Sequence, residues 1–343
     1  MLSAKIFNRQ KISCFMRKKI FTFIALCLLS AIRLWAVTPV LTGAGIGRAA
    51  VPLPVGADRR PESVTLEYQL LLADLYPGLA VVRSEMILSN NNDRAVKVRL
   101  GLPYGGSFFH DEISVVKLDS LYGLRVFWKK SPLAAVMVEG STVPEGIRPS
   151  LPGSYRDSVD RWYAWELAAP AHSRDTMVIL YAVRTGPAEL ARGGNLRRSF
   201  FFGFLLEGSR GWDGQPQSTL LQITLKGKPK RSQIYAVYPR EAFKNDTQGR
   251  LYFSVIGRNP IGHDNVLIGY DSRDNFDYFS DFLKDNEKYY GLVAKIDPDS
   301  AGLRTFSSGR FDVYPTKEYT VMGVLAACLG LVALLVIYLI KRR

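Results

Sequence analysis

The last stretch of the chain constrains its fold most strongly. Residues 321–340 (VMGVLAACLGLVALLVIYLI) carry no charged side chain, and Lys341, Arg342 and Arg343 follow them. At about 1.5 Å of rise per residue, such a helix spans roughly the 30 Å hydrocarbon core of a bilayer. An excess of Lys and Arg marks the cytoplasmic flank of a membrane helix. We therefore predict a transmembrane helix over 319–340, a cytoplasmic tail over 341–343 and an ectodomain on the other side of the membrane.

The N-terminus has the layout of a secretory signal peptide. A basic triplet at 17–19 precedes an apolar run at 20–32, which is too short to span a bilayer. Translation from Met16 would also give a signal of ordinary length. We predict cleavage that removes residues 1–36. The alternative is an uncleaved anchor, because Arg33 interrupts the apolar run.

The charge balance of the predicted ectodomain does not indicate a nucleic-acid partner. The chain has 45 Lys and Arg against 31 Asp and Glu. Ten of those cations lie in the predicted leader and tail, which leaves 35 against 31 in the ectodomain. The excess of positive charge therefore reflects targeting and topology, and no nucleic-acid partner follows from it.

Cysteine usage excludes several kinds of site. Cys14 and Cys27 lie in the predicted leader and Cys328 lies in the predicted membrane helix. The ectodomain therefore has no disulfide framework, cysteine zinc cluster or cysteine nucleophile. A region of this size can fold by apolar burial alone.

The first half of the ectodomain reads as antiparallel β-structure. Residues 37–61 are rich in Gly, Ala and Pro and are predicted to be a linker. Apolar and polar residues then alternate with the period of a strand, starting at VTLEYQLLL (64–72). We expect strands at 64–72, 79–88, 96–100, 161–167 and 176–183. Trp128, Trp162 and Trp165 lie in strands and are expected in the core. These elements predict a β-sandwich domain over 62–186.

The second half repeats this pattern. A junction is predicted over 187–196 and a second β domain over 197–275, with strands at 200–206, 219–225, 233–238, 251–256 and 265–270. Phe276, Phe279, Phe282 and Leu283 then recur at helical spacing, which predicts a helix within 276–318 that either packs on the second β domain or belongs to a juxtamembrane stalk. The predicted fold is mainly β, with two antiparallel β-sandwich-like domains plus one C-terminal transmembrane helix.

Three quoted runs carry a family resemblance. They are LYPGLAVVRSEMILSNNNDRAVKVRLGLPYGG, RWYAWELAAPAHSRDTMVILYAV and FFFGFLLEGSRGWDGQPQSTLLQITL. Together they make the chain from Val64 to Tyr270 resemble a loose class of uncharacterised, exported, membrane-anchored bacterial β-sandwich proteins. The resemblance implies an envelope location and a two-part β ectodomain, and it implies no activity.

Residue patterns that carry enzymatic chemistry are sparse. His110, His172 and His263 are isolated in sequence and lack the spacing of metal ligands. His110, Asp111 and Glu112 form the densest polar cluster, which is either a binding loop or an ordinary charged turn. No nucleophile elbow or phosphate-binding glycine loop is present. We predict no catalytic residue, no metal and no cofactor.

Trp212 and Asp213 give the best sequence case for ligand binding. They lie in GSRGWDGQP, a glycine-flanked turn where no strand obliges the indole to be buried. An exposed Trp212 would favour stacking on a sugar ring or a protein partner. A buried Trp212 would instead close the end of the sandwich and would weaken that hypothesis.

The function predicted from these features is a non-enzymatic structural or protein-interaction module of the cell envelope. It is held by one helix in the cytoplasmic membrane, with the lipid bilayer and an envelope protein as partners. Small residues at Gly323, Ala326, Ala327 and Gly330 follow one side of that helix, where helices approach closely. The alternative is a glycan-binding or small-ligand-binding ectodomain, and a hydrolase is less favoured.

Overall fold

The computed structural model describes fourteen segments of the chain. They are residues 40–53, 64–105, 107–110, 113–117, 121–139, 161–192, 195–212, 214, 216–226, 233–238, 244–245, 250–261, 264–296 and 330. The predicted signal peptide, the stalk beyond residue 296 and the cytoplasmic tail lie outside them. So does the predicted membrane helix, except Gly330. Within the described residues, no helix combines the length and apolarity needed to cross a membrane.

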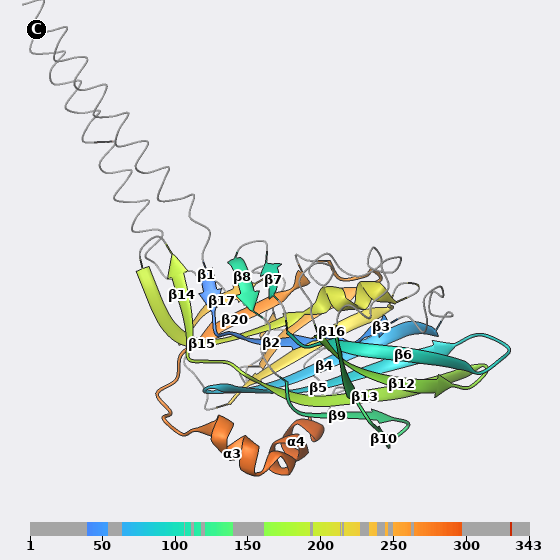
Figure 1. The fold of residues 1–343 in the computed structure, drawn as a ribbon. Coiled ribbons are helices and arrows are strands. Elements are labelled where there is room, and N and C mark those ends of the chain that lie inside the picture. Colours follow the sequence, from blue (N-terminus) through green and yellow to red (C-terminus); the bar gives the residue numbers. More distant parts are fainter. Residues whose placement is uncertain are drawn as a thin grey trace, which may run out of the picture.

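The central sheet contains the longest of the described strands, β4, β5 and β13, and Figure 1 shows its place in the fold. Its strand order is β10-β9-β13-β5-β4-β16-β19-β18. The strands are β4 (Val64–Tyr76), β5 (Leu79–Asn90), β9 (Tyr122–Trp128), β10 (Ser131–Leu133), β13 (Ser173–Arg184), β16 (Ser218–Leu225), β18 (Lys244–Asn245) and β19 (Arg250–Ile256).

Two further sheets pack on one face of the central sheet. The second sheet has the order β17-β20-β15-β14-β1-β8-β7, and β2 pairs with β15 beside this path. Its strands are β1 (Val40–Thr42), β2 (Gly45–Arg48), β7 (Ser107–His110), β8 (Ile113–Lys117), β14 (Ala188–Arg192), β15 (Asn195–Leu205), β17 (Ile234–Tyr238) and β20 (Val266–Tyr270). The small sheet, in the order β11-β12-β6-β3, contains β3 (Val51–Leu53), β6 (Val96–Pro103), β11 (Val136–Glu139) and β12 (Arg161–Ala169).

The β4–β5 hairpin shows how local sequence builds the central sheet. Alternating apolar residues give both strands one inner face, and Pro77-Gly78 connects them. Gly78 has φ +80°, which a type II turn requires at this position and which other residues rarely adopt. At the other end, the buried Asn90 donates to the carbonyl of Ala169 (3.0 Å), which ties the next turn to β12. The predicted mainly β fold, with strands in these places, is confirmed.

The boundary predicted at 187–196 does not separate two sheets. Residues on both sides of it form the hairpin of β14 and β15. Strand β16, from the second predicted domain, pairs in parallel with β4 of the first from Ser218↔Tyr68 to Leu225↔Leu75. One apolar core contains buried residues from both halves, from Ala49 to Tyr270. Strands of both predicted units therefore share one sheet and one core. The purely antiparallel pairing that we predicted is also wrong.

The predicted linker is part of the fold in its described portion. Residues 40–53 form β1, β2 and β3, and Ile46 and Val51 are fully buried. Arg48 donates its backbone N–H to the Tyr181 hydroxyl (2.8 Å), and that hydroxyl donates to the Arg48 carbonyl (2.9 Å). This pair of hydrogen bonds fastens β2 to the central sheet. The Gly and Ala residues of this stretch allow close strand contacts that composition alone does not distinguish from a linker.

The predicted helical segment forms two short helices, α3 (Tyr278–Lys284) and α4 (Asn286–Ala294). Asp277 caps α3 and Asp285 caps α4, each accepting a hydrogen bond from a backbone N–H three residues later. The helices lie under the central sheet in Figure 1, on the face opposite the other two sheets. They pack on β4 and β5, which belong to the first predicted domain, so both predicted placements of the helix are corrected.

Candidate interaction surface

The central sheet has an outer face, and the α3–α4 hairpin covers one half of it. Apolar residues of the sheet in this half, Leu72, Tyr76, Leu79, Val81 and Ala182, pack with buried residues of the hairpin. The hairpin contributes Phe282, Tyr289, Tyr290 and Val293, each at most 3% exposed. We call this part of the face the covered half.

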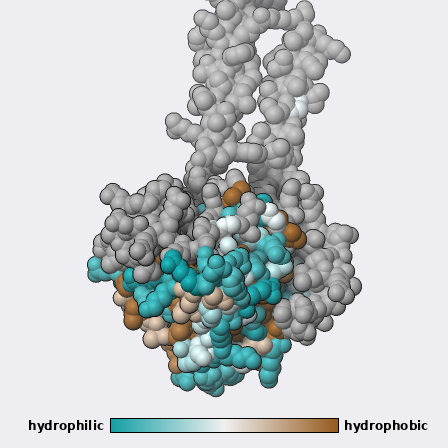
Figure 2. All heavy atoms as spheres, turned by 90° about the vertical axis from the view of Figure 1, so that its right-hand side faces the viewer, coloured by the Kyte–Doolittle hydropathy of each residue, from teal (hydrophilic) through white to brown (hydrophobic). Residues whose placement is uncertain are grey.

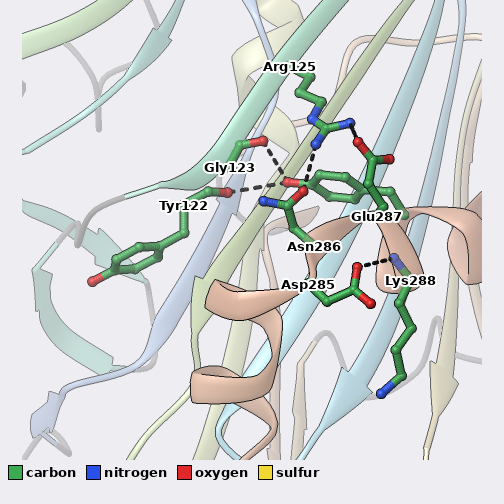
Figure 3. A network of polar contacts seen from close by, with 8 residues as sticks. Tyr122, Gly123, Arg125, Asp285, Asn286, Glu287 and Lys288 are labelled. Atoms are coloured by element: carbon green, nitrogen blue, oxygen red, sulfur yellow. Dashed lines mark hydrogen bonds and ion pairs between the residues drawn. The ribbon is translucent and has the colours of Figure 1, made fainter.

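Helix α4 crosses the strands of the central sheet. At its N-terminal end, Arg125 of β9 donates to Glu287 (2.6 Å) and to Asn286 (2.6 Å) (Figure 3). At its C-terminal end, Arg83 of β5 donates to the carbonyl of Ala294 (2.9 Å). Because β13 lies between β9 and β5, the helix runs from one strand across the next to a third. It therefore marks a boundary across the face.

Gly123 lets the hairpin approach the sheet closely. The Tyr290 hydroxyl donates to the Gly123 carbonyl (2.6 Å), which Figure 3 shows beside Tyr122. A Cβ at Gly123 would lie 2.6 Å from that hydroxyl, and the residue has φ +64°. Glycine is thus required here both for space and for backbone conformation. Burial raises the pKa of Tyr290, so the hydroxyl remains a donor.

Acidic residues around the hairpin have structural roles. Asp274 accepts from the Tyr278 hydroxyl (2.6 Å), which raises the pKa of Tyr278 to about 12. Asp281 accepts from Lys288 (2.8 Å) and from Tyr289 (2.7 Å), and these bonds lower the pKa of Asp281. Within the described part of the chain, no group of three His, Cys, Asp or Glu residues could hold a metal ion. Asp274 and Asp281, like the capping residues Asp277 and Asp285, therefore form hydrogen bonds within the hairpin segment.

One carboxylate is fully buried in the covered half. Asp74 of β4 is 0% exposed, and the Lys226 ammonium lies 3.1 Å from its Oδ2. Burial raises the pKa of Asp74, and the charge of Lys226 opposes that rise. A buried carboxylate with one cationic partner is costly if that partner is lost. Among the described residues, Asp74 belongs to no group of His, Cys, Asp or Glu side chains that could hold a metal ion.

The other half of the outer face has no described helix over it, and we call it the open half. Two rows of cross-strand neighbours run over it. One row joins Leu220, Leu70, Glu85, Val178 and Phe127, and the next joins Ser218, Tyr68, Ile87 and Thr176. All but the exposed Thr176 are half-buried. Apolar residues from five strands thus lie in this half, which we call the apolar band; Glu85 interrupts its first row, and Leu70 also packs against the hairpin cluster.

Ion pairs border this apolar band. Glu67 accepts from Arg174 Nε (2.6 Å) and from the Ser89 hydroxyl. The bond from Ser89, followed by Arg174, lowers the pKa of Glu67. Arg83 and Glu85 form a second pair. Each of these two acids is therefore paired with a base.

Tyr68 lies where the band meets the first ion pair. Its hydroxyl donates to Gln217, and the Arg174 guanidinium lies 5.8 Å from the centre of its ring. Glu67 and Tyr68 are neighbours at an irregularity of β4 between Leu66 and Tyr68. The extra residue of such a bulge turns both side chains toward the same region.

Trp212 is not a surface residue. It is 4% exposed in the main core, and its indole N–H donates to the Ala50 carbonyl (3.0 Å). The short helix η3 (Leu206–Gly211) directly precedes Trp212, whose indole packs within this core. Trp212 as an exposed stacking platform is therefore wrong, because burying the large ring and pairing its donor is more favourable. Asp213 lies outside the described residues.

The predicted polar cluster is described only in part. His110 ends β7, and its Cα pairs with Ile113 of β8 across the turn. Asp111 and Glu112 lie outside the described residues, as does His263. His172 has Nε2 3.0 Å from Asp93 Oδ1, and their side chains are 65% and 99% exposed. This pair lies on surface turns and is open to water.

The helix-packing candidates are almost entirely outside the described residues. Gly323, Ala326 and Ala327 are not described. Gly330 is helical, and a Cβ placed on it would meet nothing within 4 Å in the single chain. The prediction that this side of the helix contacts a neighbour stays a prediction.

Sequence reasoning missed the residues of the open half. Alternation places Tyr68, Ile87, Val178 and Phe127 on one side of their strands. It does not tell whether a distant helix covers that side. To identify them, one must know which residues of the five strands are paired side by side and which of those residues the hairpin covers.

Comparisons with known proteins assign no family. No family model and no curated protein matches the chain. The chain is similar to a solved structure of a Legionella pneumophila protein provisionally called a nutrient binding protein, with TM-score 0.47 and 11% identity over 79% of this chain and 82% of that chain.

Two structures of an M1 zinc metallopeptidase from Deinococcus radiodurans are more distant. Their TM-scores are 0.29 and 0.26 and their identities 10% and 8%, and each match covers 60% of this chain and 42% of that chain. One of them is a mutant bound to a Tyr-Ser-Ala substrate. These identities and scores are too low to assign an activity.

Proposed function

We propose that the protein is a non-enzymatic interaction module of the cell envelope, anchored in the cytoplasmic membrane by the helix at 319–340. The uncharged run followed by three cations supports the anchor and its orientation. In this arrangement the β-structure lies outside the cytoplasm. Its contact surface is the open half of the central sheet.

One observation carries this proposal. The hairpin covers half of a single sheet face, while Tyr68, Ile87, Val178 and Phe127 beside it are half-buried and lie next to ion pairs. An apolar centre with a polar rim is typical of protein interfaces. Figure 2, which views the end at the right of Figure 1, shows small hydrophobic patches separated by hydrophilic residues. The apolar band differs from these patches because its residues come from five adjacent strands.

The experiment uses a photocrosslinking amino acid in the native membrane. Placed at Val178, it is expected to capture a protein, because this position lies in the middle of the band. Placed at Ala168, an exposed position on the side of β12 that faces away from the central sheet, it is the matched control. Equal capture at both positions, or capture at neither, would contradict the proposed surface.

The predicted topology has its own test. A cysteine added after Arg343 should react with a membrane-impermeant reagent only after the membrane is opened. A cysteine at the exposed Thr176 should react in intact spheroplasts. The reverse pattern would overturn the orientation.

A second candidate function, glycan or small-ligand binding, is supported by the Tyr68 corner. An aromatic ring beside Arg174, Glu67 and Gln217 provides a stacking surface with planar polar groups around it. Binding of an oligosaccharide panel, lost on Tyr68→Ala and kept on Phe276→Ala, would favour this function. Phe276 is a suitable control because it is 52% exposed and lies before the hairpin.

A further inference from the structure

We infer that the core contains a binding site for ordered water, formed by Gln69 of β4, Thr219 of β16 and Ser84 of β5. The site lies on the inner face of the central sheet, so it is independent of the partner proposed for the open half. Each of the three side chains is at most 1% exposed. Both polar atoms of Gln69 and the two hydroxyl oxygens have no hydrogen-bond partner among the described residues.

The irregularity of β4 turns Gln69 into the core. Leu66 points into the main core, and Tyr68 would follow it there if the alternation continued. The extra residue between Leu66 and Tyr68 reverses the alternation, so that Gln69 and Leu71 share the inner face instead. Burying an amide without a partner is unfavourable, and buried polar groups are hydrogen-bonded as a rule. Gln69 therefore needs a partner that the neighbouring side chains do not provide.

The three polar residues are neighbours on this face. Thr219 is the direct cross-strand partner of Gln69, and Ser84 is paired with Leu71, which places it diagonally from Gln69. Neighbouring strands lie about 4.8 Å apart, and diagonal neighbours about 7–8 Å apart. A water that bridges two polar atoms spans about 5.5 Å, because each of its hydrogen bonds is about 2.8 Å long. With the reach of the Gln69 side chain, one or two waters can join all three residues.

The chemistry of the three side chains selects a neutral ligand. One amide and two hydroxyls offer both donors and acceptors, and they carry no charge. An ion would favour ligands of opposite charge, which these three side chains do not supply. Water provides a donor and an acceptor in the smallest volume, and buried waters typically bind polar groups that lack a partner in the protein. Because β4 and β16 come from the two halves of the chain, the bound water would connect both halves inside the core.

Two substitutions of matched shape test the site in the full chain purified in detergent. Gln69→Met and Thr219→Val replace polar groups by apolar groups of similar size. If the two side chains share a water, each variant leaves that water and the remaining side chain with one hydrogen bond fewer, and each should lower the Tm by about 2–4 °C. The double variant should lower the Tm by less than the sum of the single shifts, because the water leaves with its last partners. Thr176→Val, at an exposed position of β13, is the control and should shift the Tm by less than about 1 °C.

The sign of these shifts separates a water site from polar groups that bind nothing. Replacing an unpartnered buried polar group by an apolar group of the same shape is neutral or stabilising. A Tm that is unchanged or raised in both single variants would therefore overturn the water site.

A crystal structure of the native full chain gives the direct readout. We expect water density within about 3.2 Å of both the Gln69 amide and the Thr219 hydroxyl. A direct hydrogen bond between these two side chains with no water beside them would overturn the inference, and so would density for a larger molecule. Circular dichroism verifies that each variant is folded. If a variant does not fold, the native crystal structure still decides the question.

Discussion

The covered and open halves of one sheet face differ in how far their side chains are buried from solvent. In the covered half, Val81 is fully buried under the hairpin and the Asp74 carboxylate is buried from solvent. In the open half, Val178 is half-buried, and Glu67 keeps 25% of its side-chain surface exposed. The strands and their alternation are the same in both halves. The difference teaches that a helix far away in sequence decides which part of a sheet becomes core and which part remains available.

The largest expected effect comes from removing the ring that anchors the hairpin. Phe282→Ala deletes a side chain that is 1% exposed and contacts Tyr289 and Tyr290. We expect a loss of about 3–5 kcal/mol of hairpin docking. Hydrogen exchange over residues 278–294 should rise sharply. Phe276→Ala, at a ring that is 52% exposed, should change exchange little, and equal effects of the two variants would contradict the covered half.

The buried carboxylate gives the next effect. Lys226→Met leaves Asp74 without its cation, and we expect a loss of about 3 kcal/mol of unfolding free energy at neutral pH, at the low end for a buried pair because the Lys226 side chain is 31% exposed. Arg174→Met removes a comparable partner from Glu67 in the open half, where water replaces it, and should cost less than about 1 kcal/mol. Urea unfolding of both variants measures the difference. Similar losses would show that Asp74 is not buried.

The pH dependence of this pair has a definite sign. Burial raises the pKa of Asp74 above that of the unfolded chain. The stability linked to its proton is therefore complete below the unfolded pKa and is lost as pH rises through the folded pKa. Asp74→Asn has no such proton to lose. The unfolding free energy of Asp74→Asn relative to the native protein should thus increase from acidic to neutral pH.

The sequence predicted the strands better than their surroundings. In β5, the alternation correctly predicts that Val82 and Met86 share a face, and both are buried in the main core. It assigns Val81 and Ile87 equally to the other face, yet only Val81 is covered. Trp212 shows the same limit, because the carbonyl of Ala50 that accepts its N–H is 162 residues away. The local alternation of apolar and polar residues does not show which distant strands pair, such as β16 beside β4.

An isosteric substitution compares the two halves directly. Val81→Thr places a hydroxyl under the hairpin without a new partner, and we expect a loss of about 1–3 kcal/mol. Val178→Thr places the same hydroxyl where water reaches it, and the change should stay within about 0.5 kcal/mol. Thermal unfolding at one pH measures both. A costly Val178→Thr in the monomer would mean that the open half is covered.

The smallest expected effect concerns the intrinsic stability of α4, the helix that borders the open half. Gly291 lies within α4 and is exposed, and a Cβ built on it meets nothing within 4 Å. Alanine in a helix interior is favoured over glycine by about 0.5–1 kcal/mol, because glycine loses more backbone freedom on folding. Gly291→Ala should therefore stabilise α4 and slow hydrogen exchange over 286–294. Faster exchange over 286–294 in Gly291→Ala would contradict a helical, unobstructed position at residue 291.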